Sequence, residues 1–227
     1  MPIHLRPTAA LAPRVLLPGD PARALLLAQN LLSQPAMFNH NRGLWGYTGQ
    51  TAEGEPLTIQ STGMGGPSAA IVVSELAELG ATCFLRVGTC GALRSDLALG
   101  HLVIVTEALA ADGTSRALGA DRRIKPDASL THALLGLSGP DLESGPVVST
   151  DLFYDGRPGQ EAAWSRAGAV AVEMECATLF ALAGRFGVRT AALVLVTDLR
   201  VGPRRRHRPK APPPRGRRLR GPERHDE

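Results

Sequence analysis

Three arginines in this sequence stand beside glycine-containing turns, where their side chains could bind an anion. They occur in the segments "PGDPAR" (Arg23), "NHNRG" (Arg42) and "RVGTCG" (Arg86), each expected just past a strand. The planar guanidinium group makes paired hydrogen bonds to phosphate oxygens. Taken singly, each is more often a surface arginine in an ordinary strand-to-loop turn; glycine turns with adjacent arginines at several strand ends favour the anion pocket. Further donors for an anion, from backbone N–H groups and a hydroxyl, would come from Gly19, Gly88 and Thr89.

Three carboxylates form a second group that could do chemistry. Glu173 and Glu175 flank Met174 at the start of a segment expected to be helical. One carboxylate would accept hydrogen bonds from a diol such as ribose, with Met174 packing on the sugar; alternatively, both simply complement the positive end of the helix. Asp198 directly follows the apolar strand "AALVLVT". Burial there would raise its pKa and suit it to general acid catalysis, whereas a helix cap or loop aspartate is the alternative.

The polar loop "STDLFYDG" carries two aromatic residues, Phe153 and Tyr154. An aromatic ring in such a loop either stacks on a planar base or folds onto the core, and the sequence leaves both interpretations open. The glycine turn "GMGG" at 63–66 lacks the full spacing of a dinucleotide-binding fingerprint, so that interpretation is excluded.

Alternating strands and helices must position these groups. Val72, Leu76 and Leu79 fall on one face of a helix that begins at Pro67 and ends at Gly80. The alternation predicts an α/β fold, a single domain with a central mixed, twisted β-sheet flanked by helices on both faces. Ligands of such sheets bind beyond the carboxyl ends of the strands. Strands are expected at 14–17, 57–62, 82–87, 101–106 and 190–197, and helices at 21–32, 67–80 and 173–187.

The composition is that of a globular protein. With 227 residues, 44% of them hydrophobic, the chain can bury one large core. No apolar run approaches the ~18–20 residues of a membrane span, and no N-terminal signal segment is recognisable. The three cysteines are odd in number and show no paired spacing, which indicates reducing surroundings. We therefore expect a cytoplasmic protein that does not bind membranes.

Residues 201–227 differ in character from the rest of the chain. The net charge of +4 divides unevenly, because this tail holds ten basic and three acidic residues, whereas residues 1–200 hold 15 basic and 18 acidic residues. The tail is rich in proline and arginine and has no apolar period. We expect a folded domain at 1–200 and a basic tail at 201–227 that is either disordered or the product of a shifted reading frame. Nucleic-acid binding would depend on this tail alone, although such a charge run is more often simply solvated.

Several motifs together resemble the nucleoside phosphorylase family, which includes the hexameric bacterial purine nucleoside phosphorylases and the uridine phosphorylases. The resemblance runs from about His4 to Asp198. It implies the nucleoside phosphorylase-like fold, a pentosyltransferase reaction, and a dimer-based homo-oligomer, a hexamer in that family. It also implies no metal or organic cofactor, with inorganic phosphate as co-substrate. The motifs are "LPGDPARA", "NRGLWGYTG", "STGMGGPSAAIVVSEL", "LRVGTCGAL", "STDLFY" and "VEMECATLFALA".

The resemblance also implies a role for each matching position. Asp198, Arg86 and Glu175 would act in catalysis, with Asp198 as the acid and Glu175 on the 2′- and 3′-hydroxyls of ribose. Two residues, Arg42 for the phosphate and His4 for the 5′-hydroxyl, would come from a neighbouring subunit. Phosphate would be bound by Gly19, Arg23, Arg42, Arg86 and Thr89, and the nucleoside by His4, Met64, Cys90, Gly91, Phe153, Val172, Glu173, Met174 and Glu175.

Within the family, the sequence favours a purine substrate. Cys90 in "GTCG" is similar to the purine enzymes, and so is the placement of Asp198, 23 positions after Glu175. The Gln-x-Arg pair by which the uridine enzymes bind uracil is not intact, since Gln160 is followed two positions later by Ala162. Uridine phosphorolysis remains the alternative. Hydrolysis by a nucleosidase of the same fold is disfavoured, because water needs no arginine pocket.

One part of the family pattern is missing after Asp198. In the family, further ordered chain follows, including an arginine that assists the acid and a closing C-terminal helix. Here the Pro/Arg tail begins almost at once, and nothing in it matches that arginine. Sequencing the gene around codons 195–210 would test the reading-frame hypothesis, because an intact frame in the native transcript would refute it.

Overall fold

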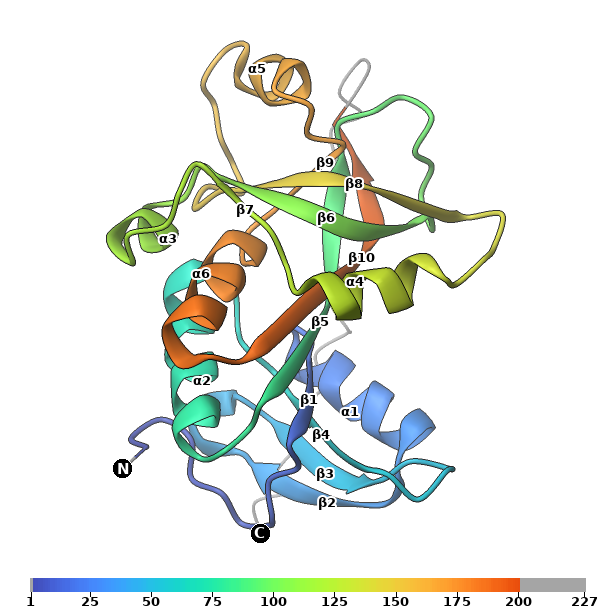
Figure 1. Ribbon diagram of the computed structural model, residues 1–227, viewed down its shortest axis with the longest axis vertical. Helices are drawn as coiled ribbons and strands as arrows, with labels where there is room; N and C mark the ends of the chain where they lie inside the picture. Colours follow the sequence, from blue (N-terminus) through green and yellow to red (C-terminus); the bar gives the residue numbers. More distant parts are fainter. Residues whose placement is uncertain (1, 201–227) are drawn as a thin grey trace, which may run out of the picture.

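A mixed β-sheet runs through the computed structural model, which describes residues 2–200 (Figure 1). Among these residues its strands are β1 (Arg14–Leu17), β2 (Ser33–Asn39), β3 (Gly46–Gln50), β4 (Pro56–Gln60), β5 (Cys83–Ala92), β6 (Leu102–Ala110), β7 (Arg123–Ile124), β8 (Leu142–Ser149), β9 (Ala171–Glu173) and β10 (Arg189–Leu199). The helices are α1 (Pro21–Leu31), α2 (Gly65–Glu78), α3 (Gly113–Ala117), α4 (Ala128–Leu135), α5 (Gln160–Arg166) and α6 (Cys176–Phe186), with a 3₁₀ turn, η1, at Asn41–Gly43.

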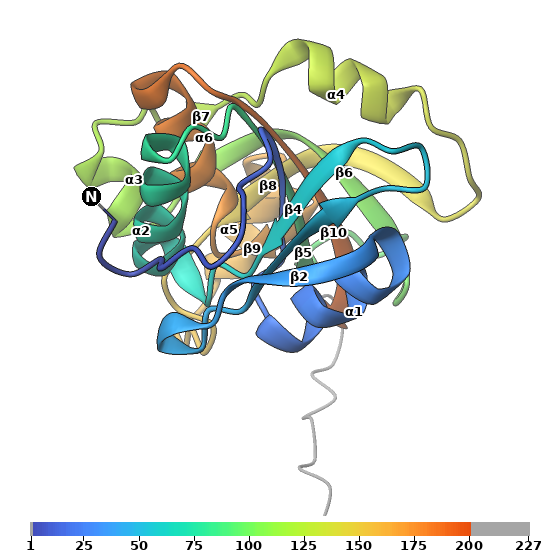
Figure 2. The ribbon, with the colours of Figure 1, turned by 90° about the horizontal axis from the view of Figure 1, so that it is seen from below.

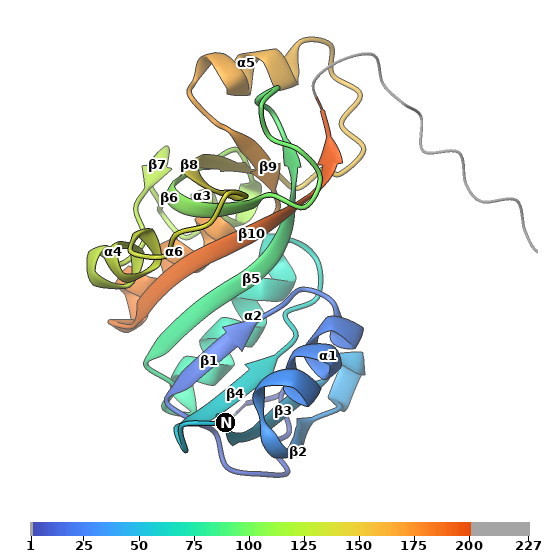
Figure 3. The ribbon, with the colours of Figure 1, turned by 90° about the vertical axis from the view of Figure 1, so that its right-hand side faces the viewer.

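Part of the sheet closes on itself. The strand order is β10-β6-β8-β9-β5-β1-β4-β3-β2, and β10 pairs a second time, in parallel with β5. The strands β10, β6, β8, β9 and β5 therefore form a small closed barrel, from which β1, β4, β3 and β2 extend as an arm. Figure 3 shows β5 and β10 side by side through the middle of the molecule. These two strands are the longest parallel pair, and both carry predicted site residues.

Helices cover both faces of the sheet, as the sequence predicts. Helices α2 and α6 pack against each other on one face, and α1 covers β3 and β4 on the other (Figure 2). Val72, Val73 and Leu76 form the buried side of α2 and belong to the main core cluster. That core lies between the α2–α6 pair and the sheet, so the start of each helix is fixed against a strand end.

The predicted elements are present, but several boundaries differ. The predicted strands at 82–87 and 190–197 continue to Ala92 and Leu199, and the helix predicted from 173 begins at Cys176. Asp198 therefore lies within β10, and the prediction that it stands just past a strand was wrong. Arg86, which falls inside the strand predicted at 82–87, lies within β5, so its predicted place past a strand was wrong as well. The reason is the long β5–β10 ladder, which continues the strands through glycines and a bulge between Val196 and Asp198. The predicted tail at 201–227 lies outside the described residues.

Candidate active site

Two glycine turns adjoin at the carboxyl ends of β1 and β4. The Thr62 backbone N–H donates to the Pro18 carbonyl at 2.9 Å. A Cβ at Gly19 would lie 3.2 Å from the Gly63 carbonyl oxygen, a close approach that favours glycine. The segments "LPGD" and "STGMGG" thus meet beside β5, at the edge of the sheet where ligands are expected.

Arg86 lies on β5 with its guanidinium held between two carboxylates. Its Nε donates to Glu173 Oε2 at 3.1 Å, and its Nη2 lies 2.5 Å from Glu175 Oε2. The motif "RVG" needs glycine two positions after the arginine, because a Cβ at Gly88 would come within 2.6 Å of Arg86 Cζ. The guanidinium lies directly over Gly88, which leaves it room to reach both acids. Burial disfavours the charged guanidinium, but the Glu175 and Glu173 charges outweigh it and raise the pKa of Arg86.

Glu173 is fixed by donors on three sides. Its carboxylate accepts the Ser149 hydroxyl, the Glu175 N–H at 2.8 Å and the Cys176 N–H at 3.0 Å. It thereby satisfies free N–H groups at the start of α6, in line with the alternative in which an acid complements a helix end. The side chain is fully buried. Glu173 thus anchors both α6 and Arg86.

Glu175 links three parts of the site. Its Oε1 accepts the Gly65 N–H at 2.5 Å, while its Oε2 faces Arg86. Burial raises the pKa of the Glu175 carboxyl, the Arg86 charge opposes that increase, and the Glu173 charge adds to it. Gly65 and Met174 line a cavity of about 570 Å³, whose rim includes the exposed Met64. The carboxylate is therefore placed beside a space large enough for a small ligand.

Asp198 lies near the far end of β10, opposite Gly91 of β5. Its side chain is 45% exposed, so the burial on which its predicted role partly rested is absent, and its place in a strand rules out the helix-cap alternative. Arg200 Nε lies 2.6 Å from Asp198 Oδ2, an ion pair by distance although the N–H does not point at the oxygen. Gly91 also faces Val172 and the Arg200 side chain, so these predicted base-site positions lie together.

Arg200 also contacts the aromatic loop. Its guanidinium carbon lies 5.0 Å from the centre of the Phe153 ring, and Nη1 lies 3.7 Å from Glu161 on α5. Phe153 and Tyr154 are exposed and in edge-to-face contact, so neither ring folds onto the core. Sequence reasoning missed Arg200. The available signal was its spacing of two from Asp198, which places both on one face of a strand.

Other predicted positions surround this cluster. Arg23 lies in the first turn of α1, three positions after the Asp20 cap that follows Gly19. Thr89 is half-buried in β5 opposite Leu195. Cys90, next to it, is buried, and burial raises the pKa of its thiol to about 12.

His4 is held by Glu75, in the last third of α2. The Glu75 carboxylate accepts the backbone N–H groups of residues 3–5 and contacts His4 Nδ1 at 2.7 Å. Burial alone would raise the pKa of Glu75, but these hydrogen bonds lower it to about 2. Glu75 comes ten positions after Gly65, about 15 Å along the helix axis. His4 is thus held at the opposite end of α2 from the Glu175 carboxylate.

Arg42 is presented beside the same N-terminal segment. The Asn41 side chain donates to the His4 carbonyl at 2.8 Å, which ties the η1 turn to that segment. Arg42 is exposed and adopts a left-handed backbone conformation with φ of 58°. The structure therefore brings His4 and Arg42 onto neighbouring surface segments.

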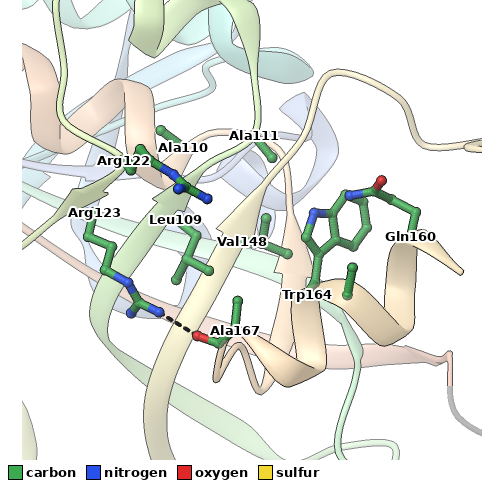
Figure 4. A pocket seen from close by; sticks show the side chains of 10 residues that line it. Leu109, Ala110, Ala111, Arg122, Arg123, Val148, Gln160, Trp164 and Ala167 are labelled. Carbon is green, nitrogen blue, oxygen red and sulfur yellow. Dashed lines mark hydrogen bonds between the residues drawn. The ribbon is translucent and has the colours of Figure 1, made fainter.

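A second cavity, of about 670 Å³, lies apart from these residues. It is enclosed by α5 and by the strands β6, β7 and β8, with Trp164 and Arg122 among its lining (Figure 4). Arg123 on its rim donates to the Ala167 carbonyl. None of the predicted site residues lines this cavity.

Comparison with known proteins defines the class. A sequence profile of the Phosphorylase superfamily matches residues 13–211. The purine nucleoside phosphorylase DeoD-type of Geobacillus kaustophilus is 38% identical over 206 residues, 87% of this chain and 86% of that protein. The purine nucleoside phosphorylase DeoD-type of Clostridium novyi is 36% identical, and the match covers 83% of each chain. A guanosine phosphorylase of Halorubrum lacusprofundi is 38% identical over 80% of this chain and 76% of that protein. The chain belongs to the phosphorylase superfamily.

Proposed function

We propose that this protein is a purine nucleoside phosphorylase. It cleaves purine ribonucleosides and deoxyribonucleosides with inorganic phosphate, reversibly, to the free base and ribose or deoxyribose 1-phosphate. The observation that carries the proposal is the buried Arg86–Glu175 contact, whose acid also accepts the N–H of Gly65 from the lining of the 570 Å³ cavity. It supports a site in which an anion-binding group and a diol-binding group lie next to each other. The purine phosphorylases among the relatives support the same assignment.

In the proposed reaction, the bond between C1′ and the base breaks and its electron pair leaves with the base. A phosphate oxygen, bound by Arg86, Arg23 and the N–H and hydroxyl donors of Gly19 and Thr89, forms the new bond to C1′. Positive charge on the ribose ring is stabilised by the phosphate beneath it. Glu175 accepts the ribose hydroxyls and so fixes the ring over the phosphate.

Asp198 gives the purine its proton at N7. The pair formed by Asp198 and Arg200 supports this role, because the arginine stabilises the carboxylate that remains after proton transfer. Phe153 stacks on the base, beside Gly91, Val172 and the buried Cys90. No metal or organic cofactor enters the proposed reaction.

The proposed assembly is a homo-oligomer built from dimers, a hexamer in its complete form. His4 and Arg42 support this, because they are held on adjacent surface segments while His4 is fixed at the far end of α2 from Glu175. Each would complete the site of a neighbouring subunit. None of the helices described between residues 2 and 200 combines the length and the apolar character that a membrane span requires.

The test is base release from inosine and from uridine by the full chain, with and without phosphate. Phosphate-dependent cleavage of inosine supports the proposal, whereas preference for uridine would establish the uridine alternative. Cleavage that proceeds equally without phosphate would contradict a phosphorylase and identify a nucleosidase. The nucleic-acid alternative rests on residues 201–227 alone and predicts binding that disappears when they are deleted.

A further inference from the structure

The guanidinium of Arg86, the proposed phosphate ligand, is engaged by two carboxylates. The side chains of Arg86, Glu173 and Glu175 are 5%, 0% and 8% exposed, so the three form a buried cluster. With both acids ionised the cluster holds two negative charges and one positive charge. A phosphate anion added to this arrangement would find Nε and Nη2 of Arg86 already facing carboxylates and would meet excess negative charge in a poorly screened environment. Phosphate can gain the Nη2 donor of Arg86 only if a carboxylate moves away from it.

The two carboxylates differ in how firmly they are held. Glu173 accepts hydrogen bonds from Ser149, from the Glu175 N–H and from the Cys176 N–H, so its release would leave the start of α6 without acceptors. Glu175 divides its oxygens between the Gly65 N–H and Arg86. Its Oε2 can therefore leave Arg86 while Oε1 keeps the Gly65 contact. Glu175 is the acid that phosphate displaces at the lower cost.

The displaced oxygen has a place to go. The cavity of about 570 Å³ is lined by Gly65, whose N–H contacts the Glu175 carboxylate, and by Met174, which precedes Glu175 in the chain. If Oε2 leaves Arg86 while Oε1 keeps the Gly65 N–H, the carboxylate stays next to two residues that line this space, where the proposed ribose lies. The same carboxylate thus serves two partners in turn.

We propose that phosphate and Glu175 compete for Arg86, and that phosphate binding releases Glu175 to accept the sugar hydroxyls. This inference rests on the proposed function, which places phosphate and ribose at this site. Phosphate raises the affinity for the nucleoside because it supplies a free acceptor, and by linkage the nucleoside raises the affinity for phosphate by the same factor.

The first test is calorimetric titration of inorganic phosphate into the full chain without nucleoside. Glu175→Gln removes the competing charge and keeps an oxygen for Gly65, so it should bind phosphate roughly tenfold more tightly than the wild type, equivalent to about 1.4 kcal/mol. Glu55→Gln, the matched control, removes an exposed carboxylate that pairs with Arg14 at the opposite end of β4, and should bind phosphate as the wild type does. Equal or weaker binding by Glu175→Gln would overturn the competition.

The second test uses the wild-type protein and does not depend on a variant that folds. A C-nucleoside, whose base is joined to ribose through carbon and cannot be released, is titrated with and without phosphate. Phosphate should tighten the binding of the C-nucleoside to the wild-type protein several-fold. An unchanged or weaker C-nucleoside affinity in phosphate would overturn the inference while leaving the proposed function intact. If the wild type and Glu175→Gln both fail to bind phosphate in the first test, the proposed function fails together with this inference.

Discussion

Replacing Gly88 by alanine tests the geometry on which the site depends. The added Cβ would lie 2.6 Å from Arg86 Cζ and Nη2, closer than side-chain contacts allow. Gly88 lies inside β5, paired with Val194 of β10, so the backbone has little room to yield. The guanidinium must move, and its contacts with Glu173 and Glu175 are lost.

The size of the effect follows from the burial of these groups. Breaking a buried ion pair costs about 3–5 kcal/mol. In a chain of this size each kcal/mol lowers Tm by about 2–4 °C, so Gly88→Ala should lower Tm by roughly 6–20 °C. The KM for phosphate should rise at least about tenfold, because Arg86 no longer faces its ligand.

The assays are thermal unfolding at fixed protein concentration and initial rates of inosine cleavage at varied phosphate. Gly184→Ala on α6 is the matched control, because a Cβ there meets nothing within 4 Å. It should leave Tm unchanged or raise it slightly, since alanine is the better helix former. A Gly88→Ala protein with wild-type Tm and wild-type KM for phosphate would refute the claim that Arg86 needs glycine at position 88 to reach its two acids.

Three further outcomes are expected. Arg200→Gln should lower kcat for inosine roughly ten- to hundredfold. Its kcat for 7-methylguanosine should change by less than about twofold, because the base of that nucleoside is already cationic and needs no proton. Equal losses of kcat on both substrates would indicate a merely structural role for Arg200. The pKa of Glu75 falls from 4.5 to about 2 on folding, so this group stabilises the protein above pH 4.5 and loses its effect as pH falls toward 2. The difference in unfolding free energy between the wild type and Glu75→Gln should narrow over that range in acid denaturation, and a constant difference would contradict the hydrogen-bonding scheme. All three cysteines are buried, so Ellman's reagent should modify none of them in the native protein and all three after unfolding. Rapid labelling of the native protein would contradict the burial of these thiols.

The sequence was sufficient to predict the architecture because the apolar periods are strong. The strand at 14–17 has the predicted bounds, and the helix at 21–32 ends one residue early, since Asp20 and Pro21 mark its start clearly. The closing of the barrel could not be predicted. It depends on β10 pairing with both β5 and β6, and a single strand's composition does not specify its neighbours.

The candidate site was predicted in its residues but not in its contacts. Types and spacing identified Arg86, Glu173 and Glu175 separately, yet nothing in the sequence indicated that they form one buried cluster. That cluster depends on the pairing of β9 with β5, which brings Glu173 and Glu175 to an arginine more than eighty residues earlier in the chain. The contacts of Glu75 and Arg200 were missed for the same reason, since each joins elements distant in the chain.

The most direct test of the central claim is the identity of the sugar product. Inosine is incubated with the full chain and phosphate in water enriched in heavy oxygen, and the products are analysed by mass spectrometry. The account predicts ribose 1-phosphate without heavy oxygen, because a phosphate oxygen attacks C1′. Free ribose formed from the start in step with hypoxanthine, with no ribose 1-phosphate, would show that water is the nucleophile and would contradict the phosphate pocket at Arg86.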